Sequence, residues 1–597
     1  MQPGKDGSLK RRATASTDRA FLDRVVAAAD QYVDTLLETH DGDVAALPHR
    51  AAMSRLLALV TVFSEPGSAF YGRIPLRGAM EKCLDRLERL QGPTGLFSGT
   101  NLSSPPDSAF TINDACMALE IVGEAGPAAD AGMADVGSRL RAVVERVTAA
   151  LVTGGVHTPN HRWELCAALA RIHSLQEREA RPRPEIAGRI GQWLAEGIDQ
   201  LPDGMYSERS PLYATAVTNP SLLAIADYAG RPELLEHVRG NLNSFLPWFN
   251  SDGSTESLFS RRQDQWFTFG GEAFQLLYRR LANQDGNADF AAAAVWLQQF
   301  PLLEPAKAVA QTRVDPWLSL ELPADAVSQD PDGGLPAVMA PDHAGLHSAG
   351  IDRFRRSGTL TTVYGGCDEL VPGVVSGLSS NPTFLRFEHG AAVLSDMRLS
   401  RSFFDLGPFR SQDTVMDGST VLLSEAVAAN FYLPLPPEKR QPDGIYALEN
   451  EGRFSASMDF ASRPTVVHSL STAVAVQVGE GGTVLDISFD GANTSFALEL
   501  TFRPGGVFEG VEPAGAAGAF QLASGTGRYT VGSDAIEFGP GNGADSDTPP
   551  VYNPGEGYRY LGGTNATDGL RVYITGRTRG THRITLRGLS LPPADAP

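Results

Sequence analysis

The hydrophobic residues of this chain change their spacing about halfway along, and this change limits what the chain can fold into. From about residue 17 to 300 they recur every three to four positions, which is the period of an amphipathic helix. Beyond about residue 346 apolar and β-branched residues alternate with polar ones, which is the period of a strand. The sequence therefore predicts an α+β multidomain protein, with a helical N-terminal domain and a β-rich C-terminal domain.

The helical half contains several well-marked apolar stripes. The clearest run over 21–37, 80–90 and 136–151. Ser16 or Thr17 is the expected N-cap of the first stripe, and Gly-Pro or Gly-Gly pairs end the other two. Further helices are expected around 160–176, 185–199, 219–229, 232–245, 271–282 and 289–299. So many helices joined by short loops exceed a four-helix bundle and favour a curved array of helix hairpins, either open or closed into an (α/α) toroid.

The C-terminal half has short strand patterns such as TAVAVQVG, TVLDISFDG and SFALELTF, separated by Gly, Asp and Asn turns. This spacing is typical of an antiparallel β-sandwich. We expect a flexible N-terminus over 1–16, an (α/α)-toroid catalytic domain over 17–310, a linker rich in Pro, Asp and Gly over 311–345, and the sandwich over 346–597.

Charge, cysteine content and the lengths of apolar runs limit the kinds of partner and the cellular location that we expect. Fifty Lys and Arg against 70 Asp and Glu give a net charge of −20, which repels a phosphate backbone, so we expect no nucleic-acid binding. The four cysteines are far apart in the sequence and are expected to be small buried hydrophobes. No apolar run is long enough for a membrane span, and the N-terminus lacks the apolar core of a signal peptide. We therefore expect a cytoplasmic protein without a membrane partner; the oligomeric state stays open.

Several familiar catalytic signatures are missing from the sequence. It has no GxxxxGK[ST] phosphate loop, no HExxH and no GxSxG. The histidines also lack the close spacing of a metal site. We therefore predict no structural metal and no cofactor.

The first segment with chemical potential is GTNLSSPPDSAFTIND, over 99–114, expected to be a polar loop between two helices. Asn101 and Asp107 can hydrogen-bond a hydroxyl-rich ligand, and Phe110 can stack on a sugar ring. The alternative is an ordinary interhelix loop in which Asp107 caps the next helix.

The second segment is HTPNHRWELCAALARIH, over 157–173. A Pro suits the first turn of a helix, so Asn160, His161, Arg162 and Trp163 are expected at a helix N-terminus, which favours a bound carboxylate. The alternative is that His161 and Trp163 pack in the core while Arg162 pairs with a surface acid.

The third segment, PDGMYSERSPLYATAVTNPSLLAIA over 202–226, places Tyr206, Glu208 and Tyr213 just before a helix. A tyrosine on such a loop can donate a proton, although both rings can equally pack beneath the loop. We expect Tyr206 to line the binding region with a mainly structural role.

The fourth segment is STESLFSRRQDQWFTFGGEAF, over 254–274, in which Arg261 and Arg262 precede Gln263 and Asp264. Paired guanidiniums bind carboxylates or sulfates in a bidentate manner. The alternative is an Arg–Asp surface pair, which contributes little. In the β half, His389 lies close in sequence to three arginines, and on a strand it faces away from Arg386 and Glu388.

The motifs TPNHRW, YSERSPLY and SRRQDQ, in that order within a toroid-plus-sandwich pattern, resemble the heparinase II/III-like polysaccharide lyases. The resemblance implies a uronic-acid glycan, such as a glycosaminoglycan, as substrate. It implies Asn160 as the group that neutralises the uronate carboxylate, His161 as base or carboxylate ligand, Tyr213 as acid or acid/base, and His389 as the candidate from the sandwich. Some members hold zinc in a His- and Asp-bearing sandwich segment; we find no such segment, and a divalent metal there stays open.

β-Elimination suits these residues chemically. The C5 proton of a uronate becomes acidic when the adjacent carboxylate is neutralised; a base removes it, and an acid protonates the O4 leaving group. The product is an unsaturated uronate, and the missing export signal favours oligosaccharides and exolytic attack.

Three other functions remain open at this stage. A toroid glycoside hydrolase would use a carboxylate pair from Asp107, Glu164, Glu208 and Asp264. A uronate C5-epimerase would abstract the same proton without losing O4. A non-catalytic glycan-binding protein would use the Arg and Trp residues for recognition alone.

Overall fold

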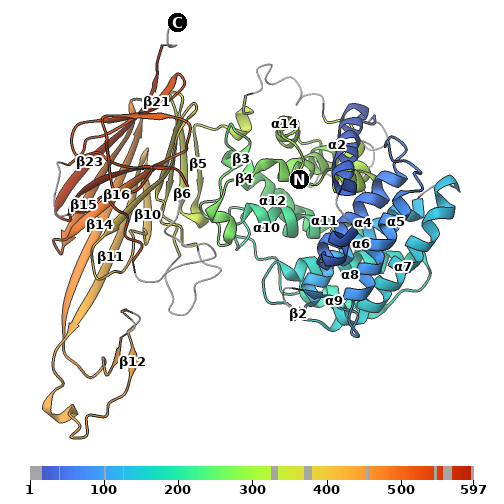
Figure 1. Cartoon of the computed structure of the whole chain (residues 1–597), viewed down its shortest axis with the longest axis horizontal. Coiled ribbons are helices and arrows are strands. Elements are labelled where there is room, and N and C mark those ends of the chain that lie inside the picture. Colours follow the sequence, from blue (N-terminus) through green and yellow to red (C-terminus); the bar gives the residue numbers. More distant parts are fainter. Residues whose placement is uncertain are drawn as a thin grey trace. The chain divides into compact units, whose positions relative to one another are not determined.

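A computed structural model describes residues 16–38, 41–99, 102–124, 127–323, 334–368, 379–451, 453–454, 456–542, 548–555 and 568–592. The expected flexible N-terminus lies outside these residues except for Ser16. The chain forms two compact units (Figure 1). The helical unit comprises Met1–Ser207, Pro211–Thr255 and Phe269–Met339, and the sandwich unit comprises Glu208–Ser210, Glu256–Thr268 and Ala340–Pro597.

The helical unit is built from helices joined by short connections. The α-helices are α2 (Arg19–Glu38), α3 (Asp41–Ala46), α4 (His49–Ser64), α5 (Leu76–Leu90), α6 (Pro105–Glu124), α7 (Pro127–Thr153), α8 (His161–Arg178), α9 (Pro184–Leu194), α10 (Pro211–Tyr213), α11 (Asn219–Tyr228), α12 (Leu235–Phe245), α13 (Gln275–Asp285), α14 (Ala288–Leu297) and α15 (Pro305–Val314). A π-helix, η1 (Ala214–Thr218), joins α10 to α11. Two small hairpins are β1 (Ser98–Gly99) with β2 (Leu102–Ser103) and β3 (Ser254–Thr255) with β4 (Phe269–Gly270).

Burial separates an inner ring of helices from an outer one. Helices such as α5 bury a single stripe, here Leu76, Met80, Cys83, Leu84 and Leu87, as expected of an amphipathic surface helix. Helix α4 is instead buried on nearly every side. It packs against α6 and α15, α6 packs against α8, and α8 packs against α11. These contacts confirm the predicted toroid, with α4, α6, α8, α11 and α15 inside.

Some local expectations were wrong. The N-cap of α2 is Asp18, whose carboxylate accepts a hydrogen bond from the Phe21 N–H at 3.0 Å, whereas Thr17 bridges to Leu320. The segment 99–114 is mostly helix, because α6 begins at Pro105 with the Ser104 hydroxyl accepting from the Asp107 N–H. The range expected to be a linker, 311–345, includes the last turn of α15 and the start of a strand.

The sandwich unit confirms the predicted antiparallel architecture. The first sheet runs β10-β11-β14-β15-β23-β21-β20-β17, and the second runs β18-β19-β22-β16-β9-β8-β7-β6-β5. Only β19 with β22 pairs in parallel among the described strands. The strands are β5 (His343–Leu346), β6 (Ile351–Arg356), β7 (Thr359–Tyr364), β8 (Leu385–His389), β9 (Ala392–Arg401), β10 (Asp413–Asp417), β11 (Thr420–Tyr432), β12 (Glu449–Asn450), β13 (Ser457–Met458), β14 (Thr465–Gly479), β15 (Gly482–Gly491), β16 (Ser495–Phe502), β17 (Val507–Glu509), β18 (Glu512–Pro513), β19 (Ala519–Gln521), β20 (Gly527–Val531), β21 (Asp534–Gly539), β22 (Leu570–Arg577) and β23 (Gly580–Ser590).

Alternation of apolar residues along the strands builds the sandwich core. Val474 on β14 and Leu485 on β15 point inward from the first sheet, and Leu394 on β9 and Leu498 on β16 point inward from the second. All four side chains are almost completely inaccessible to solvent. The period-two pattern of the sequence therefore corresponds directly to the inner faces of the two sheets.

Candidate active site in the helical unit

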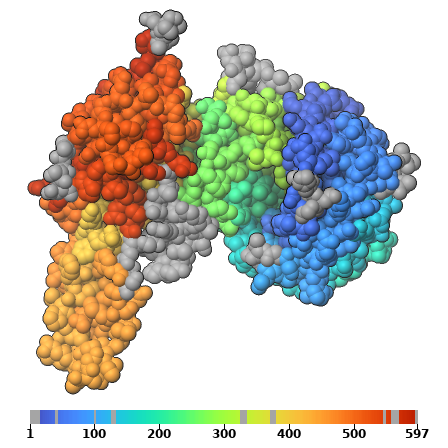
Figure 2. Space-filling view, viewed as in Figure 1, coloured from blue at the N-terminus to red at the C-terminus, as the bar shows by residue number. Residues whose placement is uncertain are grey.

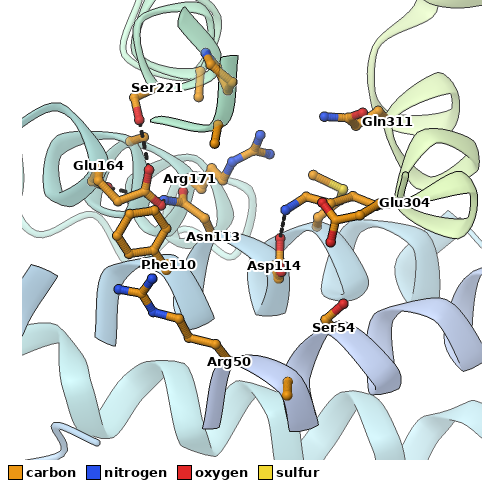
Figure 3. Close-up of a pocket in the computed structure, with 17 residues that line it drawn as sticks. Arg50, Ser54, Phe110, Asn113, Asp114, Glu164, Arg171, Ser221, Glu304 and Gln311 are labelled. Atoms are coloured by element: carbon orange, nitrogen blue, oxygen red, sulfur yellow. Dashed lines mark hydrogen bonds and ion pairs between the residues drawn. The ribbon is translucent and has the colours of Figure 1, made fainter. Parts of the chain in front are cut away.

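The inner helices of the toroid surround a cavity of about 380 Å³ (Figure 3). Alternate helices in an array of hairpins run parallel. Contacts of the second turn of α6 with the first residues of α4 and α8 show that these three helices start at one end. The N-terminal ends of helices carry partial positive charge. The polar residues lining the cavity are Arg50, Ser54, Asn113, Asp114, Glu164, Arg171, Ser221, Glu304, Lys307 and Gln311.

Glu164 lies in the wall of this cavity and is buried. Its carboxylate accepts hydrogen bonds from the Asn113 amide at 2.7 Å and the Ser221 hydroxyl at 3.0 Å. Burial nevertheless raises the pKa of Glu164 to about 6, because the charged form loses its hydration. Lys307, which also lines the cavity, forms an ion pair with Asp114 at 3.0 Å (the dashed line at Asp114 in Figure 3), and this raises the pKa of the lysine.

A cation and two aromatic rings meet beside the cavity, where α4, α6 and α8 begin. The Arg50 guanidinium stacks on the Phe110 ring, 3.8 Å from its centroid, and forms an ion pair with the buried carboxylate of Asp107. The edge of the His161 ring contacts Phe110, with centroids 6.1 Å apart. Asp107 therefore orients Arg50.

Asn160 and His161 lie together at the N-terminus of α8, as the sequence predicts. Asn160 is 2% exposed and His161 8% exposed. The Asn160 side chain makes no capping hydrogen bond to α8; its Oδ1 accepts from the Thr158 hydroxyl at 3.0 Å. A second histidine, His157, contacts the His161 ring with centroids 4.7 Å apart.

Tyr213 is half-buried and ends the short helix α10, where the backbone passes into the π-helix η1. The π-helix packs against α8, the helix that begins with His161. Single π-helical turns are rare and concentrate at functional sites. Ala216, one turn beyond Tyr213, is exposed and lines the cavity.

Tyr206 is part of the protein interior. Its hydroxyl donates to the Asn219 side-chain oxygen at 2.8 Å, and the Asn219 amide donates to Asn241. Burial raises the pKa of Tyr206 well above its ordinary value of 10.0. These contacts place the Tyr206 hydroxyl in the interior of the helical unit. Its role in the binding region stays a prediction.

Arg162 and Trp163 hold the loop that leads to Tyr206. Arg162 forms ion pairs with Glu196 at 2.8 Å and Asp199 at 2.9 Å and stacks on the Trp163 ring. Trp163 is fully buried. Asp199 also accepts from the Ser207 hydroxyl at 2.6 Å. These contacts are those of the alternative given above, in which Trp163 packs in the core and Arg162 pairs with acidic side chains.

The arginines of the fourth segment belong to the sandwich unit, together with Glu208. Arg261 binds Asp368 in a bidentate manner, at 2.7 and 2.9 Å, and Arg262 binds Glu208 at 2.6 Å. Gln263 starts a short 3-10 helix beside them. Carboxylates of the same unit thus already engage the two guanidiniums that the sequence suggested as a substrate clamp.

His389 ends strand β8, and both ring nitrogens have partners within the sandwich unit. Nδ1 lies 3.2 Å from the Gly358 carbonyl and Nε2 lies 3.1 Å from the Ser590 hydroxyl. Arg386, on the opposite face of the strand as expected, pairs with the buried Glu256. Asn101, the remaining candidate, lies outside the described residues.

The residues missed from the sequence are mainly Arg50, Asn113 and Lys307, each from a different inner helix. Arg50 and Lys307 lie in the first turns of α4 and α15, whereas Asn113 lies in the middle of α6. Only Arg50, at the start of the mostly apolar run of α4, gave a sequence signal. In the described part of the chain, no group of three or more His, Cys, Asp or Glu side chains is placed to hold a metal ion. No described helix is both long and apolar enough to cross a bilayer.

Neither a protein-family model nor a curated protein sequence matches this chain. Among solved structures, heparinase III matches 92% of this chain and 77% of its own length at TM-score 0.52, with 12% identical residues. A xanthan lyase from Paenibacillus matches 99% of this chain and 60% of its own at TM-score 0.48 and 11% identity. A heparan sulfate lyase from Pedobacter heparinus matches 92% and 76% at TM-score 0.44 and 13% identity. The match to heparinase III shows that this chain has a polysaccharide lyase fold.

Proposed function

We propose that this chain, which has the fold of the polysaccharide lyases, cleaves a uronic-acid glycan by β-elimination. The observation that carries the proposal is that Asn160 and His161 lie together at the start of α8, with the His161 ring against Phe110 of the cavity wall. A helix N-terminus and an amide donor suit a carboxylate, and the carboxylate is the group whose charge must be neutralised before the C5 proton can leave.

In this mechanism the Asn160 amide donates to the uronate carboxylate and stabilises the enolate-like charge that develops on proton loss. The Arg50 guanidinium, which lines the cavity and is oriented by Asp107 and by the Phe110 ring, would bind the anionic substrate there. A local positive potential is needed because the whole chain carries a charge of −20 and the substrate is anionic.

Proton transfer is assigned to Tyr213 and His161. When the C5 proton and the O4 leaving group lie on the same face of the sugar, Tyr213 removes the first and protonates the second. When they lie on opposite faces, His161 removes the C5 proton and Tyr213 protonates O4. The configuration at C5 of the accepted uronate therefore decides which residue acts as the base. His389 stays a prediction and takes no step here.

We propose exolytic attack, with the end of the glycan in the cavity; Asn160, His161 and Tyr213 do not line it, and Phe110 of its wall contacts His161. At about 380 Å³ the cavity lies at the lower end of small-molecule pockets, which suits the end of a glycan better than its interior. Ala216→Trp, at an exposed lining position, should therefore lower kcat/KM about tenfold or more. Ala288→Trp is the matched control, because Ala288 is also exposed on a helix but does not line the cavity. Equal activity of the two variants would exclude the cavity from substrate binding.

The decisive experiment screens uronate glycans and their oligomers for ultraviolet absorbance of the new double bond. Hyaluronan, chondroitin, heparan-type chains, alginate and gellan-like polymers all offer a uronate. On any accepted substrate, Asn160→Asp keeps the side-chain shape but opposes the carboxylate, so kcat should fall on the order of 10²–10³-fold. Unchanged turnover by this variant would exclude Asn160 as the neutralising group.

One observation favours a second candidate, hydrolysis. A carboxyl group with a pKa raised to about 6, such as Glu164, is suited to general-acid catalysis near neutral pH. Hydrolysis would give saturated products that depend on Glu164 and not on Tyr213. Product analysis of the same reactions separates the two functions, and deuterium exchange at C5 without cleavage would identify an epimerase.

A further inference from the structure

The chain passes from the helical unit to the sandwich unit and back within three residues, just before Tyr213. One helical stretch ends at Ser207, the residues Glu208–Ser210 belong to the sandwich unit, and Pro211 begins helix α10, which ends at Tyr213. A second excursion into the sandwich unit covers Glu256–Thr268. Both lie in the turquoise to green stretch of the chain in Figures 1 and 2. We call Glu208–Ser210 the entry segment, because α10 and Tyr213 follow it directly.

Arg209, in the middle of the entry segment, has a left-handed backbone with a φ of +51°. A residue with a Cβ rarely adopts this conformation, and it persists only where the surrounding contacts fix it. Such residues are concentrated at functional sites. The Arg209 side chain is also buried, with 3% of the residue exposed. A buried charge on an unfavourable backbone, four positions before Tyr213, therefore needs a specific set of partners.

The sandwich unit supplies the partners of the Arg209 guanidinium. Nη1 donates to the Ser348 carbonyl at 3.3 Å, and Nη2 lies 3.4 Å from the Gly366 carbonyl. Nη2 also lies 3.4 Å from each carboxylate oxygen of Asp368. Asp368 is itself fixed, because Arg261 binds it in a bidentate manner. Contacts to three partners define one orientation of this planar group.

Both neighbours of this arginine are anchored as well. The Glu208 carbonyl accepts from the Arg261 N–H at 3.0 Å, and the Glu208 carboxylate pairs with Arg262 at 2.6 Å. The Ser210 hydroxyl donates to the completely buried Asp264 at 2.7 Å. All of these partners come from the second excursion. Each residue of the entry segment is therefore anchored, and the direction in which α10 starts is fixed with it.

We propose that Arg209 is a positioning residue, which fixes the start of α10 and hence the place of the Tyr213 hydroxyl. The inference rests on the proposed function, in which Tyr213 protonates O4. Proton transfer needs the phenol within hydrogen-bond reach of the leaving oxygen, so an error of about 1 Å can cost about 10²-fold in rate. Arg209 acts in this way through Tyr213 and without touching the glycan.

A double-mutant cycle between Arg209 and Tyr213 tests the proposal. In Arg209→Gly the left-handed backbone stays allowed, because glycine adopts it readily, but the guanidinium contacts are lost. We expect kcat for unsaturated-product formation to fall about 10–10²-fold, with KM within about twofold of wild type. Because the effect acts through the phenol, Arg209→Gly should slow Tyr213→Phe by less than about a further twofold.

Arg209→Lys is the conservative variant, since it keeps a charge beside Asp368 but not the planar set of contacts. Its kcat should lie between those of wild type and Arg209→Gly. If Arg209→Gly does not fold, Arg209→Lys takes its place in the cycle, with the same expectation that its effect disappears in the Tyr213→Phe background.

Asp405→Gly is the matched control. Asp405 is a charged residue of the same unit with a left-handed backbone, at a φ of +50°, but its carboxylate accepts from the Asn553 amide at 2.9 Å. Its replacement by glycine should leave kcat within about twofold of wild type.

Three results would overturn the inference: a wild-type kcat in Arg209→Gly or in the lysine variant that replaces it, a loss in the Tyr213→Phe background as large as that in wild type, or an equal loss in Asp405→Gly. If wild type forms no unsaturated product from any uronate glycan, the proposed function fails and the inference fails with it. The activity of wild type therefore distinguishes the two failures.

Discussion

Replacing each of two nearby tyrosines by phenylalanine separates catalysis from stability in the helical unit. In Tyr206→Phe the ring remains but the Asn219 side-chain oxygen, 2.8 Å from the lost hydroxyl, is left one donor short in a buried site. Such a loss costs about 1–3 kcal/mol of unfolding free energy, which lowers the melting temperature by roughly 2–10 °C for a unit of this size. Turnover should stay within about twofold, because the hydroxyl faces the interior.

Tyr213→Phe should behave in the opposite way. Its ring is half-buried and keeps its packing, so the unfolding free energy should change by less than about 1 kcal/mol. Loss of a general acid lowers kcat by about 10²–10⁴-fold, which corresponds to roughly 3–5 kcal/mol in the activation barrier.

The assay for both variants is the initial rate of unsaturated-product formation, with thermal unfolding followed by circular dichroism on the same preparations. Full activity of Tyr213→Phe would refute its assignment as the acid. An equal loss of activity in Tyr206→Phe would show that the loop as a whole, rather than one phenolic proton, is responsible.

Two further predictions concern buried charges. Burial raises the pKa of Glu164 from 4.5 to about 6, so this group stabilises the folded state by about 2 kcal/mol below pH 4.5, and that contribution is lost as the pH rises to about 6. Urea unfolding of Glu164→Gln and wild type across this range should show their difference changing by about that amount, and a constant difference would contradict the assignment. Arg261→Ala should lower the unfolding free energy by about 1–2 kcal/mol, since Arg261 is partly exposed and Arg209 still contacts Asp368. The KM of this variant should change less than about twofold. A large rise in KM at unchanged stability would show instead that Arg261 binds the substrate.

The fold follows from the sequence wherever one face of an element is buried. The stripe at 80–90 is helix α5, which ends at Leu90 just before the expected Gly-Pro stop, and TAVAVQVG lies within strand β14. Helix α4 was missed for the converse reason. It is apolar on nearly all sides because it lies inside the toroid, so it has no polar face to reveal its period. Helix α6 was read as a loop because its Ser-Pro-Pro start resembles turn chemistry, although proline suits the first turn of a helix.

For the candidate site, features that depend on local sequence could be predicted, whereas contacts between distant segments could not. Asn160 and His161 could be placed at a helix start because that placement depends only on local sequence. The Arg261 partner could not be found in this way, because Asp368 lies more than a hundred residues further along the chain and is brought close only by folding. Neighbouring acids such as Asp264 are better guesses from sequence alone, yet Asp264 instead accepts hydrogen bonds from Ser210 and Ser260. Sequence therefore locates charged groups, whereas folding decides whether each meets a substrate or another side chain.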